Sequence, residues 1–179
     1  MDILAHGLWA SVGVAAANGR WAIAPRAAVV TVALAVLPDL GHMLPMWGWG
    51  LWGDGSFADL WRYALALPGQ EPVMPPSVAL VSHHLHCTMH SAIVAGGITL
   101  FVWWVRGTLW MPLLGWWSHI VIDIFTHSVD FYPSPVFYPI TQRGFDGIAW
   151  NRPWFMVLNY TALTIIALWL WRTNKRKYG

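Results

Sequence analysis

The sequence predicts an all-α fold, a polytopic integral membrane helical bundle of about five transmembrane helices in a single domain over residues 1–179. Of the 179 residues, 57% are hydrophobic and only 10% are charged, which lies outside the usual range for soluble proteins. Several uncharged runs approach the length needed to cross ~30 Å of hydrocarbon at ~1.5 Å of helical rise per residue. The polar residues are gathered in short islands between these runs. We therefore expect a bilayer as the solvent.

Each expected helix follows one apolar run. The third and fifth runs carry no formal charge over their whole length. The second and fourth are shorter uncharged stretches with ionisable residues at their ends, which is typical of spanning helices that bury polar groups against each other. The first run, near the N-terminus, gives the weakest signal. The expected helices cover residues 3–17, 26–42, 83–105, 109–127 and 153–171.

Two long loops are expected on one side of the membrane, over about residues 43–82 and 128–152. Both are rich in residues that interrupt helices, such as the prolines of YPSPVFYP. Arg62, Arg143 and Arg152 lie in these loops, and the other seven basic residues lie on the opposite side, which the positive-inside rule makes cytoplasmic. The loops then face the extracytoplasmic side of the inner membrane. The seven are Arg20, Arg26, Arg106, Arg172, Lys175, Arg176 and Lys177.

Charge, cysteine usage and missing motifs exclude several classes of protein. The formal net charge of +2 is too small to indicate a nucleic-acid partner. A single cysteine, Cys87, excludes an intrachain disulfide. The chain has no H-E-x-x-H, no G-x-S-x-G and no P-loop, and its only glutamate, Glu71, lies in a linker-like stretch. A zincin protease with a helical glutamate base is therefore excluded.

All eight histidines and two aspartates fall in four polar islands, LAHG, LPDLGH, SHHLHCTMHS and SHIVIDIFTH. The expected threading brings the four islands to the outer face of the membrane. Imidazole and carboxylate groups together form a ligand set for zinc, manganese or iron. The sequence therefore predicts a metal site set into a membrane and open to its outer side.

Of the four islands, SHIVIDIFTH gives the strongest indication of metal binding. Its His119, Asp123 and His127 are spaced i, i+4, i+8, so on a helix they form one stripe that drifts by only ~40° per step. An unpaired aspartate in a nearly charge-free helix costs several kcal/mol. Metal binding is favoured over a polar packing seam, and the carboxylate between two imidazoles is placed to bridge two ions.

The histidine-rich island and the proline-aspartate island supply further candidates. His83, His86 and His90 share a helical face, and at least two of the island's four histidines, His84 being the other, should be ligands. Asp39 follows Pro38 at a helix end, where it could cap the next segment, bind metal or act as a general base. His42 is a weaker candidate. The expected ligands are His6, Asp39, His86, His90, His119, Asp123 and His127.

The ordered set of His6, LPDLGH, HCTMHS and LLGWWSHIVIDIFTH, followed by YPSPVFYP, resembles a family of LexA-regulated, metal-dependent hydrolases of the inner membrane. The resemblance covers residues 1–139 and implies a bound metal at five of the ligands above, which are His6, Asp39, His90, His119 and Asp123. Three positions depart from the family pattern, with Gly41 in place of a second aspartate, His86 in place of arginine and Met89 in place of threonine. A looser similarity to the zinc phospholipase C and single-strand nuclease group implies phosphodiester hydrolysis.

These observations lead us to expect a metal-dependent enzyme that hydrolyses an ester, in particular a phosphoester of a membrane lipid or lipid-linked head group. One to three zinc-like ions would activate water, Asp39 or Asp123 would orient or deprotonate it, and Arg143 would bind the substrate phosphate. The first alternative is a membrane di-iron oxygenase, whose histidine-rich site would leave both aspartates unexplained. The second is a metal transporter or a non-catalytic metal-binding protein; for a transporter, ligands along a path through the bilayer would be expected.

Overall fold

The computed structural model describes residues 1–18 and 21–178, with side chains as far as residue 173. Within these ranges the chain forms seven helices and no strand. The prediction of an all-α fold is therefore confirmed for the described residues. The helices are α1 (Ile3–Asn18), α2 (Pro25–Trp52), α3 (Phe57–Leu65), α4 (Pro76–Met89), α5 (Ala92–Arg106), α6 (Leu113–Thr126) and α7 (Pro153–Tyr178).

Two helices are long and apolar enough to cross a membrane, α2 and the stretch Pro153–Thr173 of α7. Helices α4 and α5 form a third candidate span if they are taken as one pair, bent by 62° at their junction. Helices α1 and α6 are apolar but shorter. The structure is thus compatible with a membrane bundle of two or three full spans, and the expected number of about five is not confirmed.

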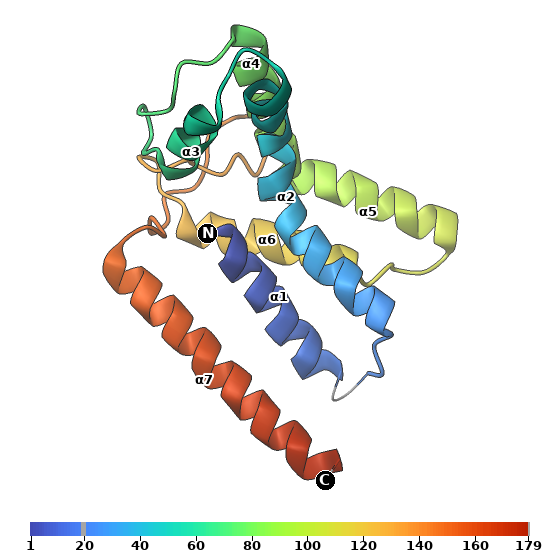
Figure 1. Cartoon of the computed structure of the whole chain (residues 1–179). Coiled ribbons are helices and arrows are strands. Elements are labelled where there is room, and N and C mark those ends of the chain that lie inside the picture. Colours follow the sequence, from blue (N-terminus) through green and yellow to red (C-terminus); the bar gives the residue numbers. More distant parts are fainter. Residues whose placement is uncertain (19–20, 179) are drawn as a thin grey trace.

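Helix α1 packs between α2 and α7, and the three axes are roughly parallel, with α2 running in the opposite chain direction to α1 and α7 (Figure 1). Helix α6 crosses behind α1 and α2, and the N-terminus lies close to the end of α6. The C-terminus lies at the far end of α7, away from the N-terminus, α3 and α4. Large side chains such as Phe101, Trp104 and Ile165 are exposed on α5 and α7, and apolar surfaces of this kind fit lipid better than water.

Helices α1, α2 and α6 approach each other closely because small residues lie where they meet. Ala5 and Ala35 are fully buried. A Cβ on Gly7 would lie 3.3 Å from the Val36 side chain, and one on Gly115 would lie 1.9 Å from the Thr31 carbonyl oxygen. Small residues allow helix backbones to pack tightly where lipid provides no hydrophobic driving force. The polar residues of the three helices are brought within reach of each other.

The prediction of one continuous third helix over residues 83–105 is wrong, because the structure has two helices there, α4 and α5. His90 ends α4 with φ −97° and ψ 8°, and Ser91 caps α5 by accepting a hydrogen bond from the Val94 amide at 3.1 Å. The Ser91 hydroxyl also donates to the Tyr138 carbonyl at 2.6 Å. A serine that caps a new helix satisfies an amide that would otherwise be unpaired. The bend leaves His90 at a corner of the chain.

The segment over residues 43–82, expected as a loop, is largely helical. Helix α2 continues ten residues past His42 to Trp52 with Pro45 inside it, α3 follows, and α4 begins at Pro76. A proline weakens a helix without always ending it, because neighbouring helices can satisfy the freed carbonyl. The second expected loop, residues 128–152, is free of helices. Of the basic residues used to orient the chain, Arg20 and the side chains of Lys175, Arg176 and Lys177 lie outside the described residues.

Candidate metal centre

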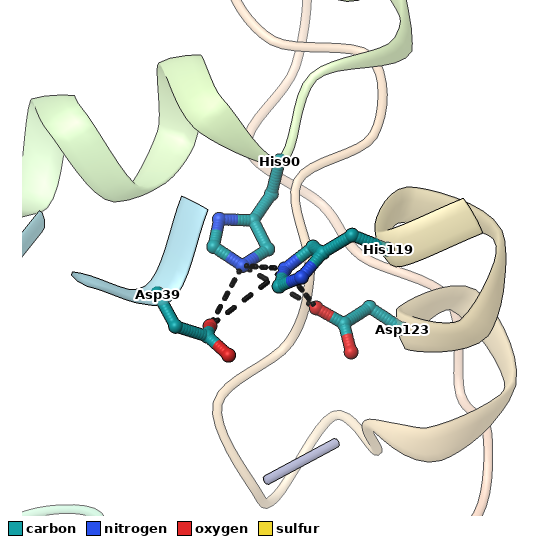
Figure 2. Close-up of side chains that lie close together, drawn as sticks. All are labelled: Asp39, His90, His119 and Asp123. Carbon is teal, nitrogen blue, oxygen red and sulfur yellow. Dashed lines mark hydrogen bonds and ion pairs between the residues drawn. The ribbon is translucent and has the colours of Figure 1, made fainter. Parts of the chain in front are cut away.

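Four side chains from three parts of the fold point at one another (Figure 2). Asp39 comes from α2, His90 from the junction of α4 and α5, and His119 and Asp123 from successive turns of α6. One ligand atom from each of these residues lies within 4.8 Å of all the others. We call these four residues the primary cluster. The spacing of its atoms is that of a site that could hold a metal ion.

The ligand nitrogen and oxygen atoms of the four side chains in the primary cluster lie close to one another. His119 Nε2 lies 3.0 Å from Asp123 Oδ2 and 3.7 Å from Asp39 Oδ1. His90 Nε2 lies 3.3 Å from Asp123 Oδ2 and 3.4 Å from Asp39 Oδ1. The two Nε2 atoms are 3.0 Å apart. Three of the four residues are fully buried, and the side chain of Asp39 is 14% exposed.

Backbone carbonyls determine which ring nitrogen of each histidine carries its proton. His119 Nδ1 lies 2.7 Å from the Ala35 carbonyl oxygen, and His90 Nδ1 lies 2.8 Å from that of His86. A carbonyl oxygen can only accept, so each Nδ1 must donate, and in neutral imidazole each Nε2 then carries a lone pair. Metal-binding histidines are usually held in this way by a second partner.

The orientation of these lone pairs is unfavourable without a cation. Both Nε2 atoms face each other and face two carboxylates, all of which are acceptors. Burial of such a group of unpaired acceptors costs several kcal/mol. Protons on the two Nε2 atoms would pair them with the two carboxylates, whereas one metal ion would accept electron density from all four groups, so the donor set also fits a divalent cation.

The second oxygen of Asp123 faces a different set of groups. Its Oδ1 lies 3.0 Å from His6 Nε2 and 3.3 Å from His127 Nε2. The ammonium group of Met1 also contacts this oxygen and lies 2.8 Å from His127 Nε2. The Nδ1 of His127 donates to the Tyr132 carbonyl at 2.6 Å, so its Nε2 also carries a lone pair. Asp123 therefore lies between two groups of imidazoles.

Local features of the chain hold the ligands in place. Pro38 removes the N–H that would bond to the Leu34 carbonyl inside α2, one residue before the Ala35 carbonyl that contacts His119. Gly147 donates to the His127 carbonyl at 2.8 Å, and a Cβ there would lie 2.6 Å from the Phe125 carbonyl oxygen. Only glycine allows this close approach, which positions the end of α6.

A cavity of about 810 Å³ opens beside the primary cluster. Asp39 lines it, and Asp123 does not. About half of its lining residues come from α3, from the segment after α3 and from α4, and they include apolar side chains such as Leu67 and Met74. The others come from the N-terminal residues, from α2 and from residues 127–151. Its volume falls in the range of small-molecule pockets. Asp39 is therefore the member of the cluster that a bound molecule can reach.

The structure does not bring every predicted site residue into the primary cluster. His86 lies beside it, with its ring centre 4.2 Å from that of His90, and lines the cavity with His42 and His83. His84 lies 3.0 Å from the Tyr138 hydroxyl, away from the cluster. Arg143 is exposed and is not among the residues that line the cavity.

Sequence reasoning missed a polar pair in the cavity wall, Glu71 and Tyr132. The Tyr132 hydroxyl donates to Glu71 Oε1 at 2.8 Å, and burial together with this carboxylate raises the pKa of Tyr132. Tyr132 also has a positive φ of 47°, which is unfavourable for a residue other than glycine. The only available signal was that Glu71 is the sole glutamate of the chain.

No protein-family model, curated protein or solved structure matches this chain. The family resemblance described above thus stays an expectation, and the chemistry of the site rests on its own residues.

Proposed function

We propose that this protein is a membrane-embedded, metal-dependent hydrolase that cleaves an ester, most favourably a phosphoester, of a lipid or lipid-linked substrate. The observation that carries the proposal is the position of Asp39. This residue belongs to a buried group of metal-ligand atoms and also lines a cavity large enough for a substrate. A metal site with one side open to a pocket is typical of catalytic sites, whereas structural metal sites are closed.

Asp39, His90, His119 and Asp123 would hold the first ion. Two imidazole nitrogens and two carboxylates suit zinc, manganese or iron better than calcium or magnesium, whose oxygen-only sites do not use imidazole, and we propose zinc among them. A second ion would be held by His6, His127 and the other oxygen of Asp123.

A bound divalent ion supplies Lewis acidity, which polarises an ester and lowers the pKa of water towards ~7. The chain's own residues then have separate roles. Asp123 is fully buried and contacts imidazoles through both oxygens, so it holds and balances positive charge. Asp39 Oδ2 is without a hydrogen-bond partner among the described residues. This oxygen is itself buried, but other atoms of Asp39 line the cavity, so we assign to the Asp39 carboxylate the role of accepting a proton from attacking water.

The lining of the cavity supports a substrate with an apolar part. The lining contains the apolar side chains of Leu65, Leu67, Met43 and Met74 together with Asp39 and several histidines. Lysine and arginine are missing from the described lining residues. A phosphoester would therefore depend on the metal for charge compensation, and the expected contact with Arg143 would need the 128–152 loop to move.

The two alternative functions find less support. A di-iron site of the histidine-box type would use nearly all the histidines, yet His83 contacts Cys87 Sγ at 3.6 Å and His84 lies near Tyr138. A transporter would need ligands along a path, whereas the described ligand atoms are gathered at one place beside one cavity. The clustering therefore favours catalysis at a fixed site.

A metal and activity screen of the purified protein tests the proposal. Protein in detergent would be analysed for metals and assayed for release of phosphate or head groups from phospholipids and polyprenyl phosphates. We expect bound divalent metal, and hydrolysis that a chelator abolishes and the metal restores. Metal-dependent uptake into vesicles without hydrolysis would instead support the transporter.

A further inference from the structure

Helix α3 carries an apolar stripe that the described part of the protein leaves uncovered. Phe57, Trp61 and Leu65 recur every four residues and are 73%, 61% and 65% exposed. Residues at this spacing share one face of a helix. The polar residues Asp59 and Arg62 lie on a different face and form an ion pair at 3.6 Å. Helix α3 is thus strongly amphipathic, with its apolar side outward.

The other side of α3 packs on α2 and helps to form the cavity. Leu60 packs so closely on α2 that a Cβ on Gly50 would lie 2.5 Å from its side chain. Tyr63 lines the cavity, and Leu65, at the end of the stripe, lines it too. Leu65 therefore lies at the rim, where the apolar stripe meets the cavity.

The length of α2 indicates the level of α3 in the membrane. If Pro25 and Arg26 lie at one boundary of the ~30 Å hydrocarbon core, then at ~1.5 Å per residue the core ends about 20 residues along α2, near Pro45. Asp39 then lies in the half of the membrane nearer to α3, and the last turns of α2 lie at head-group level. Its last residues, Leu51 and Trp52, are 53% and 83% exposed, and tryptophan prefers the interface. Only four residues separate α2 from α3. The apolar stripe is therefore continuous with the end of a candidate span at head-group level.

We propose that α3 lies in the plane of the membrane interface on the side of the metal site. Its Phe57 and Trp61 would insert into the boundary between head groups and acyl chains, and Leu65 would mark the point at which a lipid reaches the cavity. The lipid leaflet itself covers the apolar stripe. The passage of substrate past Leu65 rests on the proposed function, but the position of α3 in the interface does not.

Depth measurements with site-specific probes test the position of α3. Cys87 is the only cysteine and is 1% exposed, so single-cysteine labelling is straightforward. A fluorophore would be attached to Trp61→Cys, and to Arg62→Cys as a control on the polar face, in full-length protein in phosphatidylcholine vesicles. Quenching by nitroxide lipids and by iodide would be compared.

The label at position 61 should lie ~5–10 Å into the head-group and acyl boundary, with strong quenching by nitroxide lipid and weak quenching by iodide. The label at position 62 should be quenched weakly by nitroxide lipid and strongly by iodide. Equal iodide quenching at both positions would place the stripe in water, and quenching of position 61 by neither reagent would mean that protein covers it. Either result would overturn the proposal.

An activity comparison tests substrate access separately. Trp61→Asp should lower hydrolysis of a lipid in vesicles and leave hydrolysis of a short-chain, water-soluble ester of the same head group unchanged. Ile140→Asp, at a residue that is 82% exposed outside the cavity lining, is the matched control. Equal loss on both substrates would contradict access past α3. Wild-type protein without activity on any ester would contradict the proposed function and leave the depth measurement valid.

Discussion

Asp39 and Asp123 carry the same carboxylate but differ in what can reach them. Asp39 lines the cavity, and Asp123 is closed off behind it. Asp39→Asn should reduce turnover by the ~10²- to 10⁴-fold typical of a lost general base. Metal content should fall less than in Asp123→Asn, because Asp39 makes fewer and longer contacts. Asp130→Asn, at an exposed residue, is the control, and full turnover by Asp39→Asn would rule out the base.

His127 allows the second ion to be tested on its own. Its Nε2 contacts Asp123 Oδ1 and is not part of the primary cluster. His127→Ala should lower the metal content by one equivalent while the first ion stays bound. His84→Ala, away from the cluster, should leave the content unchanged. An unaltered metal content in His127→Ala would contradict a second ion at this position.

Several of these residues could be predicted from the sequence, and their orientations could not. Helical periodicity places His119, Asp123 and His127 on one stripe whatever surrounds them. The proton on His119 Nδ1, in contrast, is determined by the Ala35 carbonyl of another helix, 84 residues away. The role of Asp39 likewise depends on a cavity wall formed by α3 and α4, which no local pattern indicates.

At the level of elements, the contact between α2 and α6 determines the position of half the primary cluster. Gly115 lies one turn before His119, and an added Cβ would meet backbone atoms that cannot move aside. Gly115→Ala should therefore destabilise the protein by ~1–3 kcal/mol or more, as expected for overpacking, with a lower Tm and less bound metal.

The matched control is Gly97→Ala in α5, where nothing lies within 4 Å of the added Cβ. This change should stabilise its helix by ~0.5–1 kcal/mol. Both variants can be followed by thermal unfolding in detergent. A Gly115→Ala protein as stable as wild type would show that the two helices are not held by this contact.

The elements that sequence reasoning missed had weak local signals. Ser91 precedes an apolar run, which is an N-cap pattern, but no proline or glycine lies between residues 83 and 95 to indicate that the helix is broken. Ser56 and Asp59 form a capping box at the start of α3. This pattern lies in a segment rich in Gly, Pro and Trp, a composition that predicts a loop. A long apolar run predicts that a membrane helix is present. It does not predict where the helix ends, because the residues that face lipid are apolar along the whole span.

For the whole molecule, the distribution of basic residues predicts which end of the bundle faces the cytoplasm. The N-terminus contacts Asp123 of the metal site, and the C-terminal end of α7 lies far from it (Figure 1). A single cysteine at Asp54→Cys should react with an impermeant reagent in intact cells, whereas Thr173→Cys should react only after permeabilisation. Labelling of Thr173→Cys in intact cells would invert the topology and place the site on the cytoplasmic side.

The central claim is that a buried group of aspartates and histidines binds a divalent metal, and metal analysis of the purified protein is its most direct test. Wild-type protein in detergent should contain at least one equivalent of a zinc-like ion per chain. Asp123→Asn keeps the size of the side chain but removes the charge, and should lower metal affinity and hydrolysis by at least the ~10- to 100-fold of outer-shell defects. Wild-type protein free of metal yet fully active, or Asp123→Asn with full metal content and full activity, would contradict the account.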